Sequence, residues 1–475
     1  MEKSSTIQQK VAATTASVLT NANQKAEETH QILDQEAANT LSRGNGGNQH
    51  RELVISIKEM AVESGLELPP SSNECCIYRI PTHLRKLNEE AYTPQVISIG
   101  PFHHDSKRLE PMKKLKLKYF QRFLRRIENF NVLDILVNDI KVQEKRVREC
   151  YAETINLSSD NFVKLILVDG SFLIEFFYNI LSSQGSDGVV RENRTLLNPI
   201  SWPAFKLDLQ LLENQLPFFV LEILFSHARL ANYRLHSFSS LAIYFFEVTH
   251  GQKLPQNLAA NARHIVDLVR ALRVPSPRKL LSTHESNDLA SANHLYSASQ
   301  LDEAGVKFKV SSTSKCLLDL KFTNGTLEIP CIKLYNSTEI IYRNIIAFEQ
   351  CHYPYDSHFT DYIVLLTFLI TTPKDVDLLI RKGIIINGLG NSNAVASFLN
   401  NMGTNVPYDG FNSAYYDLFE GLNAFYENSK NIWKATLKRD YFSTPWRIAS
   451  TAAAGILLLL TLGQFICSII QVVKM

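Results

Sequence analysis

Two adjacent histidines followed by an aspartate, His103-His104-Asp105, form the cluster in this sequence with the clearest potential for chemistry. Imidazole titrates near neutral pH, so it can serve as a general acid, a general base or a metal ligand. Neighbouring side chains of an extended segment point to opposite sides, so a metal bound by one histidine would need its other ligands from elsewhere in the chain. A loop whose imidazoles hydrogen-bond to the backbone is the simpler interpretation.

Three carboxylates lie within otherwise apolar segments, at Asp169, Glu175 and Glu213. A buried carboxylate requires a cationic or hydrogen-bonding partner, and two that came together could act as an acid–base pair. Asp169 could instead cap the second half of a helical stretch over Phe162–Leu181. An enzyme that uses these carboxylates or the two histidines is therefore kept as an alternative function.

Motifs with a specific catalytic or cofactor-binding spacing are absent from the sequence. It has no phosphate-binding GxxxxGK loop, no GxSxG, no HExxH and no CxxC. Gly388-Leu389-Gly390 is a lone GxG, and Cys75-Cys76 has no second ligand pair to complete a tetrahedral metal site. We therefore assign no catalytic, cofactor-binding or metal-binding residue, and expect a protein that is not an enzyme and needs no cofactor.

A strongly basic stretch runs from Lys107 to Arg126, with nine Lys or Arg residues and Glu110 as the single acid. Apolar residues at helical spacing give it one face to bury. Nine charges could bind the phosphates of lipid headgroups or of nucleic acid, but a solvated or internally paired face is the ordinary outcome. The net charge of the whole chain is only +2, so we expect no nucleic-acid partner.

The elements that must position these groups are mainly helical. Of the 475 residues, 45% are hydrophobic, enough for a sizeable core. Residues 1–51 are polar and predict a flexible arm, and 52–437 predict a helical head domain. The turn Asn324-Gly325 between two apolar segments predicts a small antiparallel β-sheet near 305–334. The predicted fold class is thus mainly α with one small sheet.

The C-terminal segment Ile448–Val473 carries no charge. As a helix it would be about 39 Å long, which exceeds the ~30 Å of a hydrocarbon core. We predict one transmembrane helix over 448–473, with Trp446 and Arg447 at one interface and Lys474 at the other. A basic juxtamembrane linker over 438–447 precedes it.

The charges that flank this segment predict its orientation. Before it lie Lys430, Lys434, Lys438, Arg439 and Arg447, and after it only Lys474. The positive-inside rule then leaves the head in the cytosol, as a single-pass protein of the plasma membrane or an endomembrane. The seven scattered cysteines form no disulfide framework, which agrees. Four glycosylation sequons, at Asn156, Asn193, Asn324 and Asn336, point the other way.

Several short blocks, in their order along the chain, resemble the plant family named for domain of unknown function 247. The blocks include residues 77–81, 97–104, 169–172, 212–219 and 348–351, with the terminal anchor after them. The resemblance implies a single-pass plant membrane protein with a mostly helical head. Some grass members of the family are linked to self-incompatibility as pollen-side determinants. The family has no agreed catalytic residues, so none is carried over.

Together these observations predict a non-enzymatic, membrane-anchored plant protein of recognition or signalling, with a pollen-side self-incompatibility determinant as its finer form. The lipid bilayer is one expected partner and an unidentified protein is another; the oligomeric state is left open. Specificity would lie in the polar loops over 184–198 and 274–300. A membrane-active or pore-forming protein is a further alternative, because several head helices are very apolar.

Overall fold

The computed structural model describes residues 74–127, 131–182, 201–228, 236–250, 262–274, 295–311, 316–404, 413–428 and 445–473, with a few further positions. Nearly all of these belong to one unit, residues 72–475. Of the other unit, residues 1–71, the structure describes only positions 52 and 54–56, which are helical. The predicted arm over 1–51 lies outside the described residues, as do most of the 438–447 linker and most of both polar loops.

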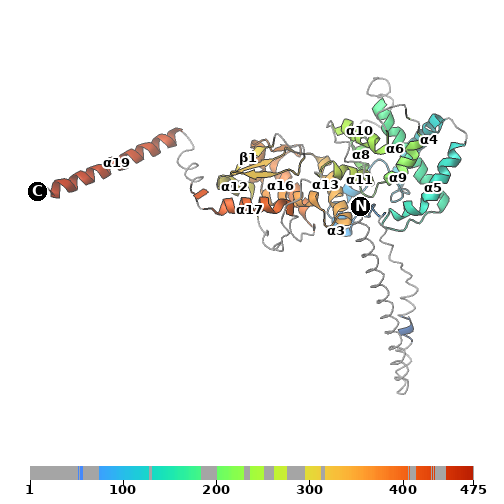
Figure 1. Ribbon diagram of the computed structural model, residues 1–475, viewed down its shortest axis with the longest axis horizontal. Coiled ribbons are helices and arrows are strands. Elements are labelled where there is room, and N and C mark those ends of the chain that lie inside the picture. The colour runs from blue at the N-terminus through green and yellow to red at the C-terminus, as the bar shows by residue number, and fades with distance from the viewer. Residues whose placement is uncertain are drawn as a thin grey trace, which may run out of the picture. The chain divides into compact units, whose positions relative to one another are not determined.

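Helix α6 (Ser159–Ser182) is the central element of the first half of the head. It contacts four other helices, α4 (Glu110–Ile127), α5 (Val132–Glu149), α9 (Phe218–His227) and α10 (Phe238–His250), as Figure 1 shows. Because α6 is apolar on nearly every side, it must be covered all round to leave water. The neighbours do this, and most of its side chains are buried.

Asp169 and Gly170 lie inside α6, which continues unbroken past them. The prediction that Asp169 caps a second half-helix is therefore wrong. Gly170 faces α9, where a Cβ would lie 2.4 Å from Leu224 Cδ1. Glycine is thus present to let two helices approach closely, and tertiary packing outweighs its low helix propensity.

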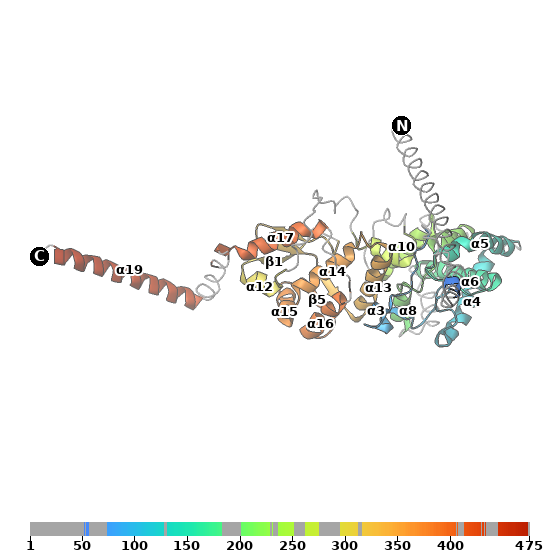
Figure 2. The ribbon, with the colours of Figure 1, turned by 90° about the horizontal axis from the view of Figure 1, so that it is seen from below.

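The second half of the head is also helical, and Figure 2 shows three of its helices, α14, α15 and α16, together. Both α14 and α15 contact α16. The longer helices are α13 (Asn336–His352), α14 (His358–Leu369), α15 (Pro373–Arg381), α16 (Ser392–Gly403) and α17 (Ser413–Glu427). The described head also has shorter helices in both halves, namely α3 (Thr82–Arg85), η1 (Glu89–Tyr92), η2 (Lys107–Leu109), α8 (Ser201–Asp208), α11 (Ile265–Ala271) and α12 (Ala298–Glu303).

The predicted hairpin is confirmed. Strands β2 (Lys321–Thr323) and β3 (Thr326–Ile329) pair antiparallel across Asn324-Gly325. Both turn residues have positive φ, 49° and 72°, as a two-residue hairpin turn of this kind requires. The sheet is not wholly antiparallel, however, because β1 (Lys307–Val310) pairs parallel with β3. Strand β3 lies between the other two, so the small sheet is mixed.

A second, two-stranded sheet was not predicted. Strand β4 (Ile332–Leu334) follows directly on β3 and pairs parallel with β5 (Ile385–Asn387). Pro330 separates β3 from β4, and proline cannot donate to a ladder. The chain therefore changes partner at this point and ties the hairpin region to the segment between α15 and α16.

Two of the described helices are long and apolar enough to cross a membrane, α6 and α19 (Pro445–Val473). In α6, 67% of the most apolar stretch is buried inside the head, whereas in α19 none of it is. Helix α19 begins three residues before the predicted Ile448 and ends at the predicted Val473. Trp446, Arg447 and Ile448 are exposed in its first turn, and Lys474 lies outside the described residues.

Candidate functional site

The segment that runs from the last residue of α8 to the start of α9 contains an unusual number of buried polar side chains. We call Asp208–Pro217 the buried polar segment. Five of its side chains are polar and almost fully buried: Asp208, Gln210, Glu213, Asn214 and Gln215. Burying so many polar groups is unfavourable unless each has partners, and those partners define the site.

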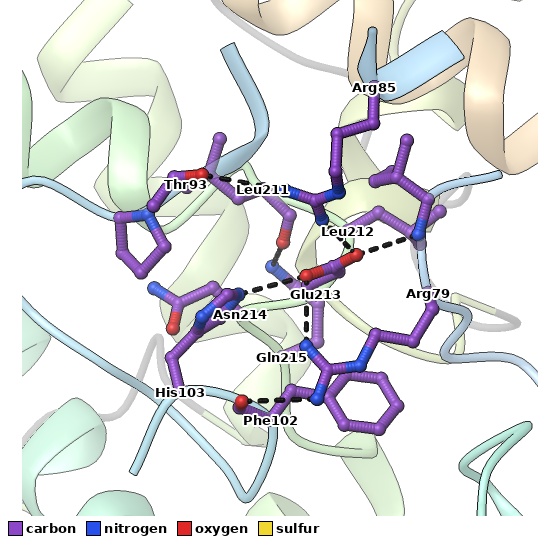
Figure 3. A network of polar contacts seen from close by, with 12 residues as sticks. Arg79, Arg85, Thr93, Phe102, His103, Leu211, Leu212, Glu213, Asn214 and Gln215 are labelled. Atoms are coloured by element: carbon purple, nitrogen blue, oxygen red, sulfur yellow. Dashed lines mark hydrogen bonds and ion pairs between the residues drawn. The ribbon is translucent and has the colours of Figure 1, made fainter. Parts of the chain in front are cut away.

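Glu213 lies at the centre of the site, as Figure 3 shows. One carboxylate oxygen accepts hydrogen bonds from Arg85 and, at 2.7 Å, from the backbone N–H of Ile80. The other oxygen lies 3.2 Å from Arg79 Nη1 and 3.0 Å from His103 Nε2. Burial alone would raise the pKa of Glu213, but the His103 side chain, the Ile80 amide and Arg85 together lower it to about 2. Glu213 is therefore an anion at neutral pH and a weak proton acceptor.

The two histidines have separate partners. His103 faces Glu213, while His104 Nδ1 lies 2.7 Å from the carbonyl oxygen of Pro101. The simpler interpretation, in which the imidazoles contact the backbone, thus holds for His104. The sequence analysis did not predict that His103 lies beside the carboxylate of Glu213. Within the described residues, no group of three or more His, Cys, Asp or Glu side chains is placed to hold a metal ion.

Arg79 connects the Glu213 centre to the turn that carries the histidines. Its Nη2 donates to the carbonyl oxygen of Phe102 at 3.3 Å, and its guanidinium lies 4.2 Å from the centre of the Phe102 ring. Its Nε donates to Glu153 at 3.1 Å. A planar guanidinium with five donors suits such a junction, because it can serve several acceptors at once.

Asp208 is buried in the same segment but has a different environment. Its carboxylate accepts hydrogen bonds from the backbone N–H groups of Gln95, Val96 and Ile97, at 2.6–2.8 Å. Burial raises the pKa of Asp208 to about 6, although these three amides and the charge of Arg108 oppose the rise. A carboxylate without a cation in direct contact thus titrates far above Glu213, five residues away.

Asn214 and Gln215 complete the connections between the buried polar segment and its neighbours. Asn214 accepts from the Ile99 amide at 2.6 Å and donates to the Ile97 carbonyl at 3.0 Å. Gln215 accepts from the Ile265 amide at 2.9 Å, at the start of α11. A Cβ on Gly100, whose φ is +75°, would lie 2.5 Å from the Gln215 carbonyl oxygen. Only glycine fits that close approach.

The other two predicted carboxylates, on α6, each have a cation from α4. Lys116 Nζ lies 2.6 Å from Asp169, which also accepts from the Gly100 amide at 2.9 Å. Arg126 donates to both oxygens of Glu175, at 3.1 and 2.7 Å. Among the described contacts, no ion pair or hydrogen bond joins one of the three carboxylates to another. They form three separate ion-pair centres rather than one acid–base pair.

The arrangement connects two parts of the chain that are far apart in sequence through hydrogen bonds and ion pairs. Side chains of the buried polar segment satisfy backbone groups of the chain over residues 79–99, which holds only the short helices α3 and η1. Two arginines of the same stretch, Arg79 and Arg85, neutralise Glu213. Sequence reasoning selected Glu213, Asp169 and Glu175, but missed Asp208, Asn214 and Gln215. A usable signal was present, namely a run of polar residues inside an otherwise apolar stretch.

Fold and site together define a mainly helical protein whose core is held by buried ion pairs and side-chain-to-backbone hydrogen bonds. The chain belongs to the DUF247 family, described as plant proteins of unknown function, whose family model matches residues 77–460. That match begins at the first strand-like contact of the head, Ile77, and extends into α19. It includes the whole buried polar segment.

Two proteins of Arabidopsis thaliana are similar over most of their length. The UPF0481 protein At3g47200 is 28% identical over 421 residues, which cover 84% of this chain and 87% of that protein. The UPF0481 protein At3g02645 is 22% identical over an aligned length of 483, covering 81% of this chain and 88% of that protein. No solved structure is significantly similar to the chain.

Proposed function

We propose that this chain is a membrane-anchored, non-enzymatic plant protein whose head binds another protein in recognition or signalling. The observation that carries the proposal is the contrast between α19, whose apolar side chains are uncovered, and a head that buries its own apolar helices. An uncharged apolar helix without protein cover is stable in lipid, where its backbone groups are satisfied internally.

The ion pairs of the head support a non-catalytic role. Glu213 is held as an anion by three donors, Arg79, Arg85 and the Ile80 amide, and Asp169 and Glu175 each have a cation. A general base needs a free lone pair and a pKa near the working pH, which Glu213 lacks. The pore-forming alternative has less support, because α6 and α14 are covered within the head.

The basic residues before α19 support a cytosolic head at the plasma membrane or an endomembrane. The structure makes this orientation sharply testable, because Asn156, Asn324 and Asn336 of three sequons are exposed. A lumenal head would offer all three to the glycosylation machinery. We would place the full chain, tagged at its N terminus, in sealed microsomes and measure protease protection together with glycosidase-sensitive mass. A digested tag without a mass shift is expected; a protected tag with shifts would reverse the orientation.

Recognition itself is tested by exchange of segments between relatives. Residues 184–198 and 275–294 lie outside the described residues and differ in composition from the apolar head around them. We would exchange these two segments between this chain and a relative with a different binding partner, and measure which partner each chimera captures from pollen extract. If partner choice follows the exchanged segments, the result supports a role in recognition. Capture of the partner from pollen also supports the finer hypothesis of a pollen-side self-incompatibility determinant. Partner choice that stays with the head would refute their role.

A further inference from the structure

Helix α4 sorts its basic residues between two environments. Lys116 and Arg126 point toward α6 and pair with its carboxylates. Tyr119, Phe123 and Ile127 are buried on the same side. These positions are spaced by three, four or seven residues, so they mark the face of α4 that the head covers.

The opposite face of α4 is basic and exposed. It carries Lys114, Lys118 and Arg125, spaced by four and seven residues. Lys107, in η2, lies seven residues before Lys114 and is also exposed. At 3.6 residues per turn, the three α4 residues fall within roughly 40° of one another and point away from the buried face. We call these four residues the α4 basic face.

Among the described residues, the helical residues of this face differ from the basic residues of α5 in having no acid paired with them. Glu110, the single acid of α4, pairs with Lys113 at 2.8 Å. Within the described part of the chain, Lys114, Lys118 and Arg125 have no acidic partner. On the neighbouring α5, by contrast, Lys141, Lys145 and Arg146 each lie within 4.0 Å of an acid, Asp160, Glu149 and Glu74 respectively.

An apolar side chain stands at the edge of the same face. Leu117 is 50% exposed and directly precedes Lys118 in the chain. Cations around an exposed leucine are the composition that interfacial helices use, because the cations bind phosphate while the apolar chain enters the acyl boundary. A nucleic-acid groove would gain nothing from the leucine, and the chain as a whole has a net charge of only +2.

We propose that the α4 basic face binds the headgroups of anionic phospholipids in the membrane that holds α19. This inference rests on the proposed membrane anchor and cytosolic head. The anchor keeps the head close to one leaflet, so a weak surface contact becomes an intramolecular one with a high effective concentration. Each Lys or Arg near an anionic surface strengthens binding about fivefold, so four such residues suffice to dock a tethered head.

The test uses the full chain reconstituted into vesicles of phosphatidylcholine alone or of phosphatidylcholine with phosphatidylserine. Lysines are acetylated briefly with a water-soluble reagent, and the rate at each position is measured by mass spectrometry. Lys145 and Lys374, whose side chains are 91% and 71% exposed, are internal controls outside α4. We expect acetylation of Lys107, Lys114 and Lys118 to be at least fivefold slower with phosphatidylserine, and protection to be lost in about 0.5 M salt, where screening shortens to a few ångströms.

A variant pair separates binding from folding. Lys114→Glu with Lys118→Glu should abolish the protection of Lys107, whereas the matched Lys145→Glu with Lys374→Glu should preserve it. Circular dichroism melting of both variants confirms that the head is folded. Equal acetylation of the α4 lysines on both vesicle types would overturn the inference, as would protection that the Lys114 and Lys118 reversal leaves intact. The proposal that α19 is a membrane anchor is tested separately: it would be refuted if alkaline carbonate released the chain from the vesicles.

Discussion

Helices α6 and α19 satisfy the same length and composition test for a membrane span, yet their surroundings are opposite. Helix α6 carries Asp169 and Glu175, and α4 supplies a cation to each. Helix α19 is uncharged from Ile448 to Val473, and its leucines are exposed. An apolar helix with embedded carboxylates requires a protein neighbour that brings the counter-charges, whereas one without them needs only lipid. The polar residues inside an apolar run, rather than its length, distinguish the two.

Removal of α19 should have the largest effect. It tests directly whether α19, unlike α6, is the helix that holds the chain in the membrane. We expect a chain that ends at Thr444 to move entirely from the membrane pellet to the supernatant after alkaline carbonate extraction. The head should keep its melting temperature, because the apolar stretch of α19 has no protein cover. A truncated chain that still pellets as a folded protein would show that the head holds the membrane without α19.

Lys116→Met should strongly destabilise the head. It leaves Asp169 buried without its cation, and breaking a buried ion pair on one side costs about 3–5 kcal/mol of the free energy of unfolding. Denaturant unfolding measures this loss. Lys113→Met is the matched control on the same helix, because its pair with Glu110 is largely exposed and should change stability by less than ~1 kcal/mol. Equal effects of the two substitutions would mean that α6 does not depend on its counter-charges.

Two glycines sharpen the comparison. In Gly170→Ala the new methyl group would enter the α6–α9 contact, 2.4 Å from Leu224 Cδ1. Overpacking of this kind typically costs ~1–3 kcal/mol, measurable as a shift of the denaturant midpoint. In α19, Gly455 has no atom within 4 Å of a new Cβ, so Gly455→Ala should leave head stability and membrane retention unchanged. If Gly170→Ala left the denaturant midpoint unchanged, α6 and α9 would be able to move apart without a loss of stability.

The smallest effect expected is a pH dependence of the Lys116→Met loss. Burial raises the pKa of Asp169 above its usual value, and Lys116 opposes this. A raised folded-state pKa means that stability is present below the unfolded pKa of about 3.9 and is lost as pH rises through the folded value. Removing Lys116 should raise the pKa of Asp169 further, so the loss should be smaller near pH 5 than near pH 7.5. A loss that grows on acidification would contradict this sign.

Local sequence patterns predicted part of the fold. The hairpin at Asn324-Gly325 and the existence of the apolar helix α19 follow from turn chemistry and apolar length, which are encoded locally, although α19 begins three residues before the predicted Ile448. The parallel pairs of β1 with β3 and of β4 with β5 were not predictable in this way. In the pair of β4 with β5, Ile332 lies opposite Ile385, 53 residues later in the chain. No local signal specifies such a pairing.

The candidate site shows the same division. Glu213 was predictable as a carboxylate that needs partners, but the identity of those partners was not. Arg79 lies 134 residues earlier in the chain, and its choice of acceptor depends on how the whole first half folds. Asp169 was also given a local capping role because Asp-Gly-Ser is a common start of a helix, whereas its contacts with Lys116 of α4 and the Gly100 amide give it a different one.

The long sequence separation of the contacts made by Asp208, Glu213 and Asn214 has a consequence for biosynthesis. The amides of residues 80, 95–97 and 99 are satisfied by side chains that emerge from the ribosome more than 100 residues later. Until Asn214 has been made, the N-terminal part of the head cannot complete these contacts, and such non-local contacts form slowly. The nascent head must therefore remain protected from aggregation through much of translation, and molecular chaperones are the natural agents of that protection.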